Sequence, residues 1–209
     1  MPTVLSPAEQ RVVLRSVSWE TYDRLLSEDP ESVSPRFTYD DGELEIMTPS
    51  PEHEWYSDLI SDLVKLLARE LRIDILSLRS TTFRRKDAKR GFEPDSCFYV
   101  AHVREMRGKK KMNLTVDPPP EIVVEVEVTN SSISKFPICA QFGVQEIWTY
   151  DGDRLSIYRL TESKYVEVPS SEVLPGLVAS QLTEFIELGK SMDSVTWPDE
   201  VLNRFRKLR

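Results

Sequence analysis

The sequence has few of the residues that build disulfide frameworks and zinc sites. Among 209 residues there are two cysteines, Cys97 and Cys139, and two histidines, and neither pair is clustered. Two distant cysteines exclude a disulfide framework and are typical of a reducing compartment, so we expect a cytoplasmic protein. The same scarcity argues against a zinc site of Cys and His ligands. Any metal would have to be a hard cation held by oxygen ligands.

Long apolar runs are absent as well. No stretch approaches the ~18 consecutive apolar residues of a membrane helix, and the start, MPTVLSPAEQRVVLRS, lacks the apolar region of a signal peptide. A hydrophobic content of 40%, with four Trp, seven Tyr and eight Phe, argues against disorder. The composition therefore predicts a globular protein with a sizeable core and no membrane partner.

Charge is unevenly distributed along the chain. The net charge of −8 argues against a nucleic-acid partner, yet residues 79–111 hold eleven basic residues against four acids. That segment carries +7, which leaves −15 for the rest. Solvated basic loops would explain the cluster, and so would a patch that faces phosphates. If it is a patch, the candidate DNA-binding residues are Arg84, Arg85, Lys89 and Arg90.

Periodicity and turn residues predict a mixed β-sheet flanked by helices, an α/β or α+β domain. The 17–34 segment contains a first helix, 35–48 forms a β-hairpin with an Asp41–Gly42 turn, and Ser50 caps a long helix. We expect one domain over 1–190 and a C-terminal helical tail over 191–209. The other expected strands are 73–79, 81–85, 95–100, 121–129, 145–151, 154–160 and 164–168, and the other expected helices are 134–142, 181–189 and 197–208, with a loop over 104–120.

Three acidic residues on two apolar strands could carry chemistry. In VVEVEV, Glu125 and Glu127 share one face of a strand because side chains alternate. Asp95 opens another apolar strand after a proline. Acids on neighbouring strands can hold Mg²⁺, which activates water beside a phosphate, and a nearby lysine can stabilise negative charge. The structural alternatives are that Glu125 and Glu127 lie on the solvent face of a strand and that Asp95 forms a turn. A glycosidase with paired carboxylates is a weaker alternative function.

Several motifs then resemble one family in the correct order. The chain is similar to the Uma-type family of restriction endonucleases, a domain of unknown function within the PD-(D/E)xK nuclease superfamily, over roughly 40–190. The motifs are YDDGELEIMTPSPEHE at 39–54, FEPDSCFYV at 92–100, DPPPEIVVEVEVTNSS at 117–132, KFPICAQFGVQEIWTYD at 135–151 and EVLPGLVASQLTEF at 172–185.

This resemblance implies a restriction-endonuclease-like sheet and a Mg²⁺-dependent (or Mn²⁺-dependent) endonuclease that hydrolyses DNA. It makes Asp95 and Glu125 metal ligands and places Glu127 where the superfamily usually has its lysine, as a third ligand or a neighbouring acid. The family's lysine comes later, at Lys135. His53 matches a histidine of the family and is, with Lys135, a candidate catalytic residue, and Glu52 or Glu54 is the candidate accessory acid.

Two further expectations concern partners. Double-strand cutters of this kind commonly pair two sites, so a homodimer is expected. Because position 127 lacks the usual lysine, an alternative is a catalytically inactive nuclease-like fold that acts as a nucleic-acid- or protein-binding module.

Overall fold

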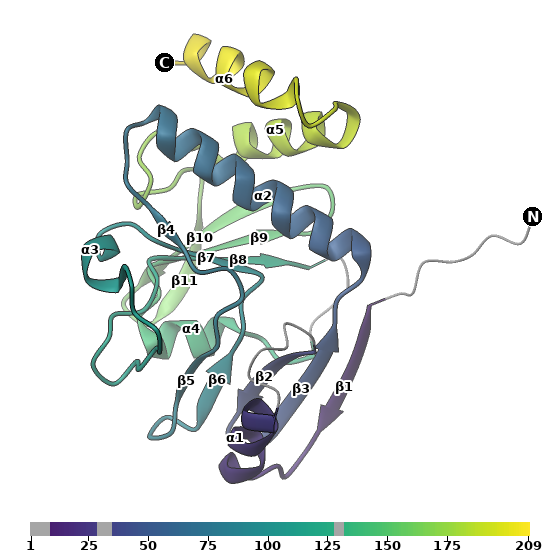
Figure 1. The fold of residues 1–209 in the computed structure, drawn as a ribbon, viewed down its shortest axis with the longest axis vertical. Helices are drawn as coiled ribbons and strands as arrows, with labels where there is room; N and C mark the ends of the chain where they lie inside the picture. Colours follow the sequence, from purple (N-terminus) through teal and green to yellow (C-terminus); the bar gives the residue numbers. More distant parts are fainter. Residues whose placement is uncertain (1–8, 29–34, 128–131) are drawn as a thin grey trace, which may run out of the picture.

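The computed structural model describes residues 9–28, 35–127 and 132–209, and these form two β-sheets flanked by helices (Figure 1). The first sheet has the strand order β1-β3-β2-β6-β5, and the second has β11-β10-β9-β8-β7-β4. The strands are β1 Gln10–Leu14, β2 Arg36–Asp40, β3 Glu43–Thr48, β4 Leu76–Ser77, β5 Phe83–Arg85, β6 Arg90–Phe92, β7 Ser96–Tyr99, β8 Ile122–Val126, β9 Glu146–Tyr150, β10 Leu155–Thr161 and β11 Lys164–Val168.

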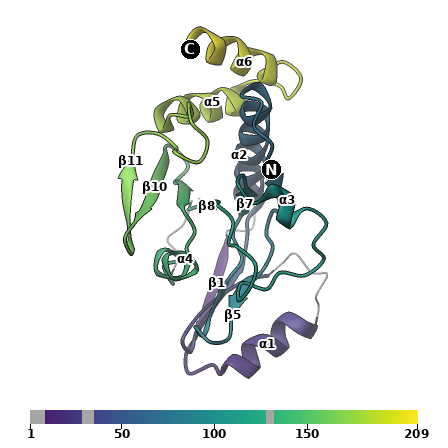
Figure 2. The same ribbon diagram turned by 90° about the vertical axis from the view of Figure 1, so that its left-hand side faces the viewer.

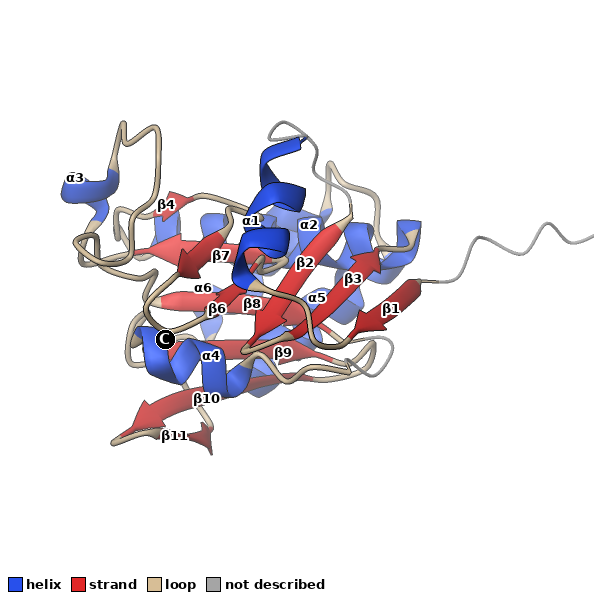
Figure 3. Cartoon of the chain, turned by 90° about the horizontal axis from the view of Figure 1, so that it is seen from below, coloured by secondary structure: helices blue, strands red, loops and turns tan. Residues whose placement is uncertain are grey.

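Helices cover both faces of the second sheet. The helices α2, α5 and α6 lie on one side, and α4 lies on the other (Figure 3). The helix α1 packs on the first sheet, at the end of the molecule opposite α6 (Figure 2). The helices are α1 Trp19–Glu28, α2 Pro51–Glu70, α3 Val103–Met106, α4 Phe136–Phe142, α5 Ala179–Ser191 and α6 Trp197–Lys207.

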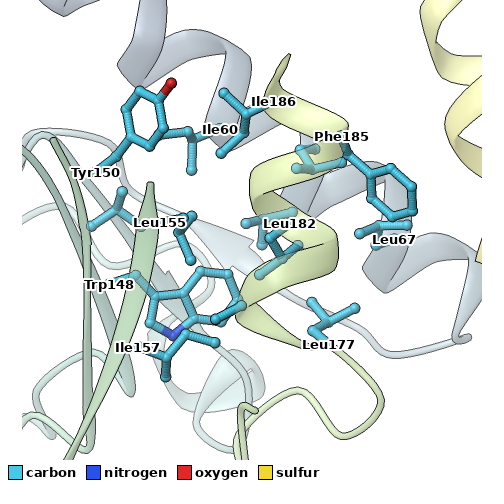
Figure 4. Packing of buried hydrophobic residues seen from close by; sticks show 14 of the residues in the cluster. Ile60, Leu67, Trp148, Tyr150, Leu155, Ile157, Leu177, Leu182, Phe185 and Ile186 are labelled. Carbon is cyan, nitrogen blue, oxygen red and sulfur yellow. The ribbon is translucent and has the colours of Figure 1, made fainter. Parts of the chain in front are cut away.

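The main core lies between the second sheet and the helices α2 and α5 (Figure 4). Trp148 and Ile157 come from the sheet, Ile60 and Leu67 from α2, and Phe185 from α5, and each of these side chains is at most 1% exposed. Helix α6 adds its apolar side to the same core through Trp197, Val201 and Phe205. This packing fixes the position of α2, which carries His53 in its first turn.

The hairpin and the long helix are confirmed. Asp41 and Gly42 both have positive φ, 40° and 104°, as a two-residue hairpin turn between β2 and β3 requires. At the start of α2 the Ser50 side chain accepts a hydrogen bond from the His53 backbone N–H at 3.1 Å. The mixed α+β fold class is confirmed as well, because β8 and β9 pair in parallel and all other strand pairs are antiparallel.

The structure differs from the predicted elements at four places. Strands β1 and β6 were not predicted, because QRVVL does not alternate apolar and polar residues and RGF has only three residues. Of the expected strand 73–79 only Leu76–Ser77 forms a strand, and the first residues of the expected loop 104–120 belong to the short helix α3. Part of the expected first helix and part of strand 121–129 lie outside the described residues, and the boundary at 190 stays a prediction.

No helix in the described parts of the chain is both long and apolar enough to cross a membrane.

Candidate active site

The strand register brings Asp95 and Glu125 opposite each other. Ser96 pairs with Val124 in the antiparallel β7–β8 ladder, so the next pair outward is Asp95 and Glu125. Directly opposite residues have Cβ atoms roughly 5 Å apart. Asp95 Oδ2 accepts a hydrogen bond from the backbone N–H of Val126 at 2.6 Å, which fixes its carboxylate beside β8. Both side chains are buried, so both acids lie inside the protein.

Strand alternation explains why these acids face α4 rather than the main core. Ile122, Val124 and Val126 of β8 point to the core under α2, whereas Val123 points to the core under α4. Glu125 shares the face of Val123 and is therefore directed to the side where α4 begins.

Lys135 contacts Glu125 at the start of α4. Its Nζ lies 2.6 Å from Glu125 Oε2 and donates a second hydrogen bond to the backbone carbonyl of Glu93 at 3.0 Å. Burial raises the pKa of Glu125, and the neighbouring Lys135 opposes that rise. The structure therefore brings together a buried carboxylate and an ammonium group that are ten residues apart in sequence.

Glu127 lies at the edge of this arrangement. It follows the last residue of β8, its backbone N–H donates to the carbonyl of Tyr150 at 2.7 Å, and the residue is exposed. Nowhere in residues 9–28, 35–127 or 132–209 do three Asp, Glu, His or Cys side chains come together as a possible metal site. A role for Glu127 as third ligand stays a prediction.

His53 lies behind Asp95 and is fully buried. Its Nε2 accepts a hydrogen bond from Arg36 Nη1 at 3.2 Å, and since an arginine can only donate, the ring proton lies on Nδ1. Nδ1 donates to Glu9 Oε2 at 2.9 Å. Burial, together with the Arg36 charge, lowers the pKa of His53 to about 4, so the imidazole is neutral at neutral pH.

Arg36, on β2, contacts three groups of the site. Its Nη1 forms an ion pair with Asp95 Oδ1, and its Nη2 bonds Glu54 Oε1. Asp95 Oδ1 also lies 2.9 Å from His53 Nε2, but neither contact of this oxygen is aligned as a hydrogen bond. Glu54 therefore reaches the site only through Arg36. Glu52 accepts from the hydroxyl of Tyr56 at 3.4 Å and is exposed.

A second arginine extends this network toward the sheet edge. Arg11 Nε lies 2.6 Å from Glu9 Oε1, and Arg11 Nη1 lies 2.7 Å from Glu45 Oε1. Glu45 in turn accepts from the backbone N–H of Ser132 at 2.8 Å. Arg11 on β1, itself paired with Glu45 on β3, thus holds Glu9, the acceptor that fixes the His53 tautomer.

Sequence reasoning missed Arg36, Glu9 and Arg11. Their contacts join residues 9, 36, 53 and 95, and no local pattern encodes such long-range pairs. One available signal was the spacing in RFTYD, where Phe37 and Tyr39 point to the core under α1 and thereby turn Arg36 to the other face.

The predicted basic patch is largely neutralised by local acids. Arg84 pairs with Asp23, Arg85 with Asp87, Lys89 with Asp41 and Arg90 with Asp40. In the described parts of the chain, three exposed cations of the 79–111 segment form no ion pair: Arg104, Lys110 and Lys111. The positive charge that is free to meet a phosphate is therefore centred on α3 and the loop after it.

Comparison with protein families matches residues 19–192 to Uma2, described as "Putative restriction endonuclease". The chain belongs to the Uma2 family. This confirms the resemblance seen in the sequence motifs, and the matched region includes His53, Asp95, Glu125 and Lys135.

A solved structure supports the fold of this Uma2 protein. It is a crystal structure of a "putative nuclease belonging to DUF820" from Anabaena variabilis, with a TM-score of 0.53 at 15% sequence identity. The alignment covers 81% of this chain and 99% of the other. At this identity the similarity establishes a shared fold. Comparison with curated proteins finds no match.

Proposed function

We propose that this Uma2 protein is a metal-dependent endonuclease that hydrolyses DNA phosphodiester bonds. Its active site would be of the PD-(D/E)xK type. The observation that carries the proposal is the buried pair Asp95 and Glu125 on adjacent strands, with Lys135 Nζ 2.6 Å from one of the carboxylates. The family description and the shared fold support the same reaction class.

The donor set fits a hard divalent cation. Glu125 Oε1 is buried and has no hydrogen-bond partner in the described structure, although the other oxygen of this carboxylate is bonded to Lys135. An unpaired buried carboxylate oxygen is costly unless something binds it. Mg²⁺ is commonly held by one or two carboxylates together with substrate phosphates. Asp95 and Glu125 would therefore hold Mg²⁺ or Mn²⁺.

The residues around that pair have separable roles. A divalent cation, when bound, would lower the pKa of a water molecule and neutralise charge on the phosphoryl oxygens. Lys135 keeps an ammonium beside the reacting phosphate and stabilises the negative charge that develops there. The backbone N–H of Val126 and the Arg36 guanidinium orient the Asp95 carboxylate.

DNA binding is proposed for the surface around α3 and the following loop, where Lys110 and Lys111 form no ion pair with described residues. Replacing both by glutamine is expected to weaken DNA binding about tenfold or more and to reduce the salt slope of log K by about 2, because two phosphate contacts are lost. Fluorescence anisotropy with a labelled duplex at several salt concentrations measures both quantities.

The matched control is the double glutamine variant of Lys65 and Lys86, which removes the same charge from lysines already paired with Asp62 and Glu20. It should bind DNA nearly as the wild type does. Equal losses in the two variants would show that net charge, and not this surface, determines binding.

The cleavage assay uses the purified full chain with supercoiled plasmid and with single-stranded DNA. We expect cutting with 5–10 mM Mg²⁺ or Mn²⁺, roughly the range in which weakly held cations saturate, and no cutting after chelation with EDTA. A mock purification from cells that lack the chain controls for contaminating nucleases. Uncut DNA under all these conditions would exclude the proposed activity. A homodimer, which would cut both strands, can be tested on the same sample by light scattering.

A second candidate is a nucleic-acid-binding module without turnover. It is favoured by one observation: Asp95 and Glu125 each already contact an internal cation, Arg36 and Lys135. Salt-sensitive DNA binding without cleavage at any metal concentration would support this alternative.

A further inference from the structure

Arg36 is a buried cation placed against a proposed metal ligand. It is 5% exposed, and its guanidinium contacts Asp95, which is itself 4% exposed. Its Nε has no hydrogen-bond partner in the described structure, and neither has Glu125 Oε1. Asp95 Oδ1 has none either among the described residues, so one donor and two carboxylate oxygens without hydrogen-bond partners lie in one buried site, where each would ordinarily find a partner.

Contacts with residues other than Asp95 fix the position of Arg36. Nη1 donates to His53 Nε2 at 3.2 Å, and His53 is held by Glu9 at 2.9 Å through its other nitrogen. Nη2 is paired with Glu54 on the first turn of α2. Both direct partners lie in the first turn of α2, and Glu9, just before β1, holds one of them, so the guanidinium does not depend on Asp95 alone.

Arg36 and Lys135 give each proposed ligand its own cation. A divalent ion that approaches Asp95 and Glu125 meets two positive charges at short range, and like charges this close repel strongly in a medium of low dielectric constant. A phosphodiester carries the negative charge that would offset the repulsion. The Arg36 Nε–H is a free donor in the same site.

We propose that Arg36 is a positioning residue that keeps the metal site of the free protein closed to divalent cations, so that the cation binds tightly only together with the phosphodiester. The proposal rests on the proposed function and adds an order of assembly to it: the free enzyme carries little metal, and metal and DNA increase each other's affinity by the same factor.

The test measures Mn²⁺ binding by the full chain. Electron paramagnetic resonance monitors the binding with and without a short DNA duplex. We expect Arg36→Gln to bind Mn²⁺ at least tenfold more tightly than the wild type when DNA is absent. DNA should tighten Mn²⁺ binding by the wild type at least tenfold and by the variant much less. Arg36→Lys, which restores the charge, should return toward the wild-type affinity.

The control for net charge is Arg206→Gln, since Arg206 is exposed on α6 and pairs with Glu70 away from the site. Its Mn²⁺ affinity should equal that of the wild type. If wild type and Arg36→Gln bind Mn²⁺ equally, and Glu125→Gln loses that binding, the role of Arg36 is overturned while the metal site stands. If no chain binds Mn²⁺ with or without DNA, the proposed function itself fails.

Stability gives a second readout, because Arg36→Gln leaves Asp95 without its cation. Mn²⁺ should raise the melting temperature of this variant by more than it raises that of the wild type. If the variant is unfolded without metal, circular dichroism during a Mn²⁺ titration should show refolding. Failure of Mn²⁺ to stabilise or refold the variant would overturn the proposal.

Discussion

Asp95→Asn and Lys135→Met are each expected to reduce DNA cleavage by at least ~10²-fold and up to ~10⁴-fold, the range seen when a charged group acts directly at a reacting centre. Asp95→Asn removes one of two proposed metal ligands while keeping the shape that accepts the Val126 N–H. Lys135→Met keeps the length of the side chain and removes the charge beside Glu125. Initial rates on plasmid DNA at saturating Mg²⁺ measure both losses.

Glu167→Gln is the matched control, because Glu167 is exposed on β11, three strands away from β8, and pairs with Arg154. We expect a change of less than ~3-fold, since an exposed charge acts through water of high dielectric constant. Full activity in Lys135→Met together with inactivity in Glu127→Gln would contradict the assignment and place the essential charge at position 127. Mn²⁺ binding by each variant separates a lost ligand from a lost charge.

Acid should destabilise the metal-free protein through His53. The pKa of His53 is about 4 in the folded chain, against about 6.5 when unfolded, so the unfolded state binds the extra proton between these values. Stability contributed by the neutral ring is complete above pH 6.5 and is lost as the pH falls toward 4. The loss is of the order of 3 kcal/mol because the ring is fully buried. Urea unfolding in EDTA at pH 4 to 7.5 measures it.

Glu125 changes the pH dependence of folding stability in the direction opposite to that of His53. Burial raises the pKa of this carboxyl, so above pH 4.5 the folded state binds more protons than the unfolded state, and stability falls as the pH rises through the raised value. The His53 contribution is therefore obtained as the difference between the wild type and His53→Gln at each pH. If the two stability curves are parallel, His53 does not titrate as described.

The sequence predicts the local features of this fold well. The Asp41–Gly42 turn and the Ser50 cap depend on a few adjacent residues, and both are present. That Asp95 and Glu125 are acids set in apolar strand segments could also be predicted from the sequence. Periodicity could not show that these two strands pair, because the pairing depends on packing between distant parts of the chain.

Ion pairing across the fold was beyond local reasoning. A DNA-binding role for the basic residues 84–90 stays a prediction, but their partners Asp23, Asp40 and Asp41 lie elsewhere in the chain and could not be foreseen. Similarly, the length of His53's helix was clear from the sequence, whereas its partners Glu9 and Arg36 come from strands that the hydrophobic pattern does not connect. A cluster of basic residues in one segment predicts a positively charged surface only when the acidic residues that pack beside it are known.

Strand β1 has a practical consequence for anyone who trims this protein. The family match begins at residue 19, yet Glu9, the acceptor for His53 Nδ1, lies ten residues earlier. A fragment that starts at residue 19 would lack Glu9, so the buried Nδ1 proton of His53 would have no acceptor. The proton would then no longer be held on Nδ1, and Nε2 would no longer be fixed as the acceptor for Arg36. Recombinant versions intended for crystallisation or assays should therefore keep β1, because the edge of a sheet is here part of the chemical site.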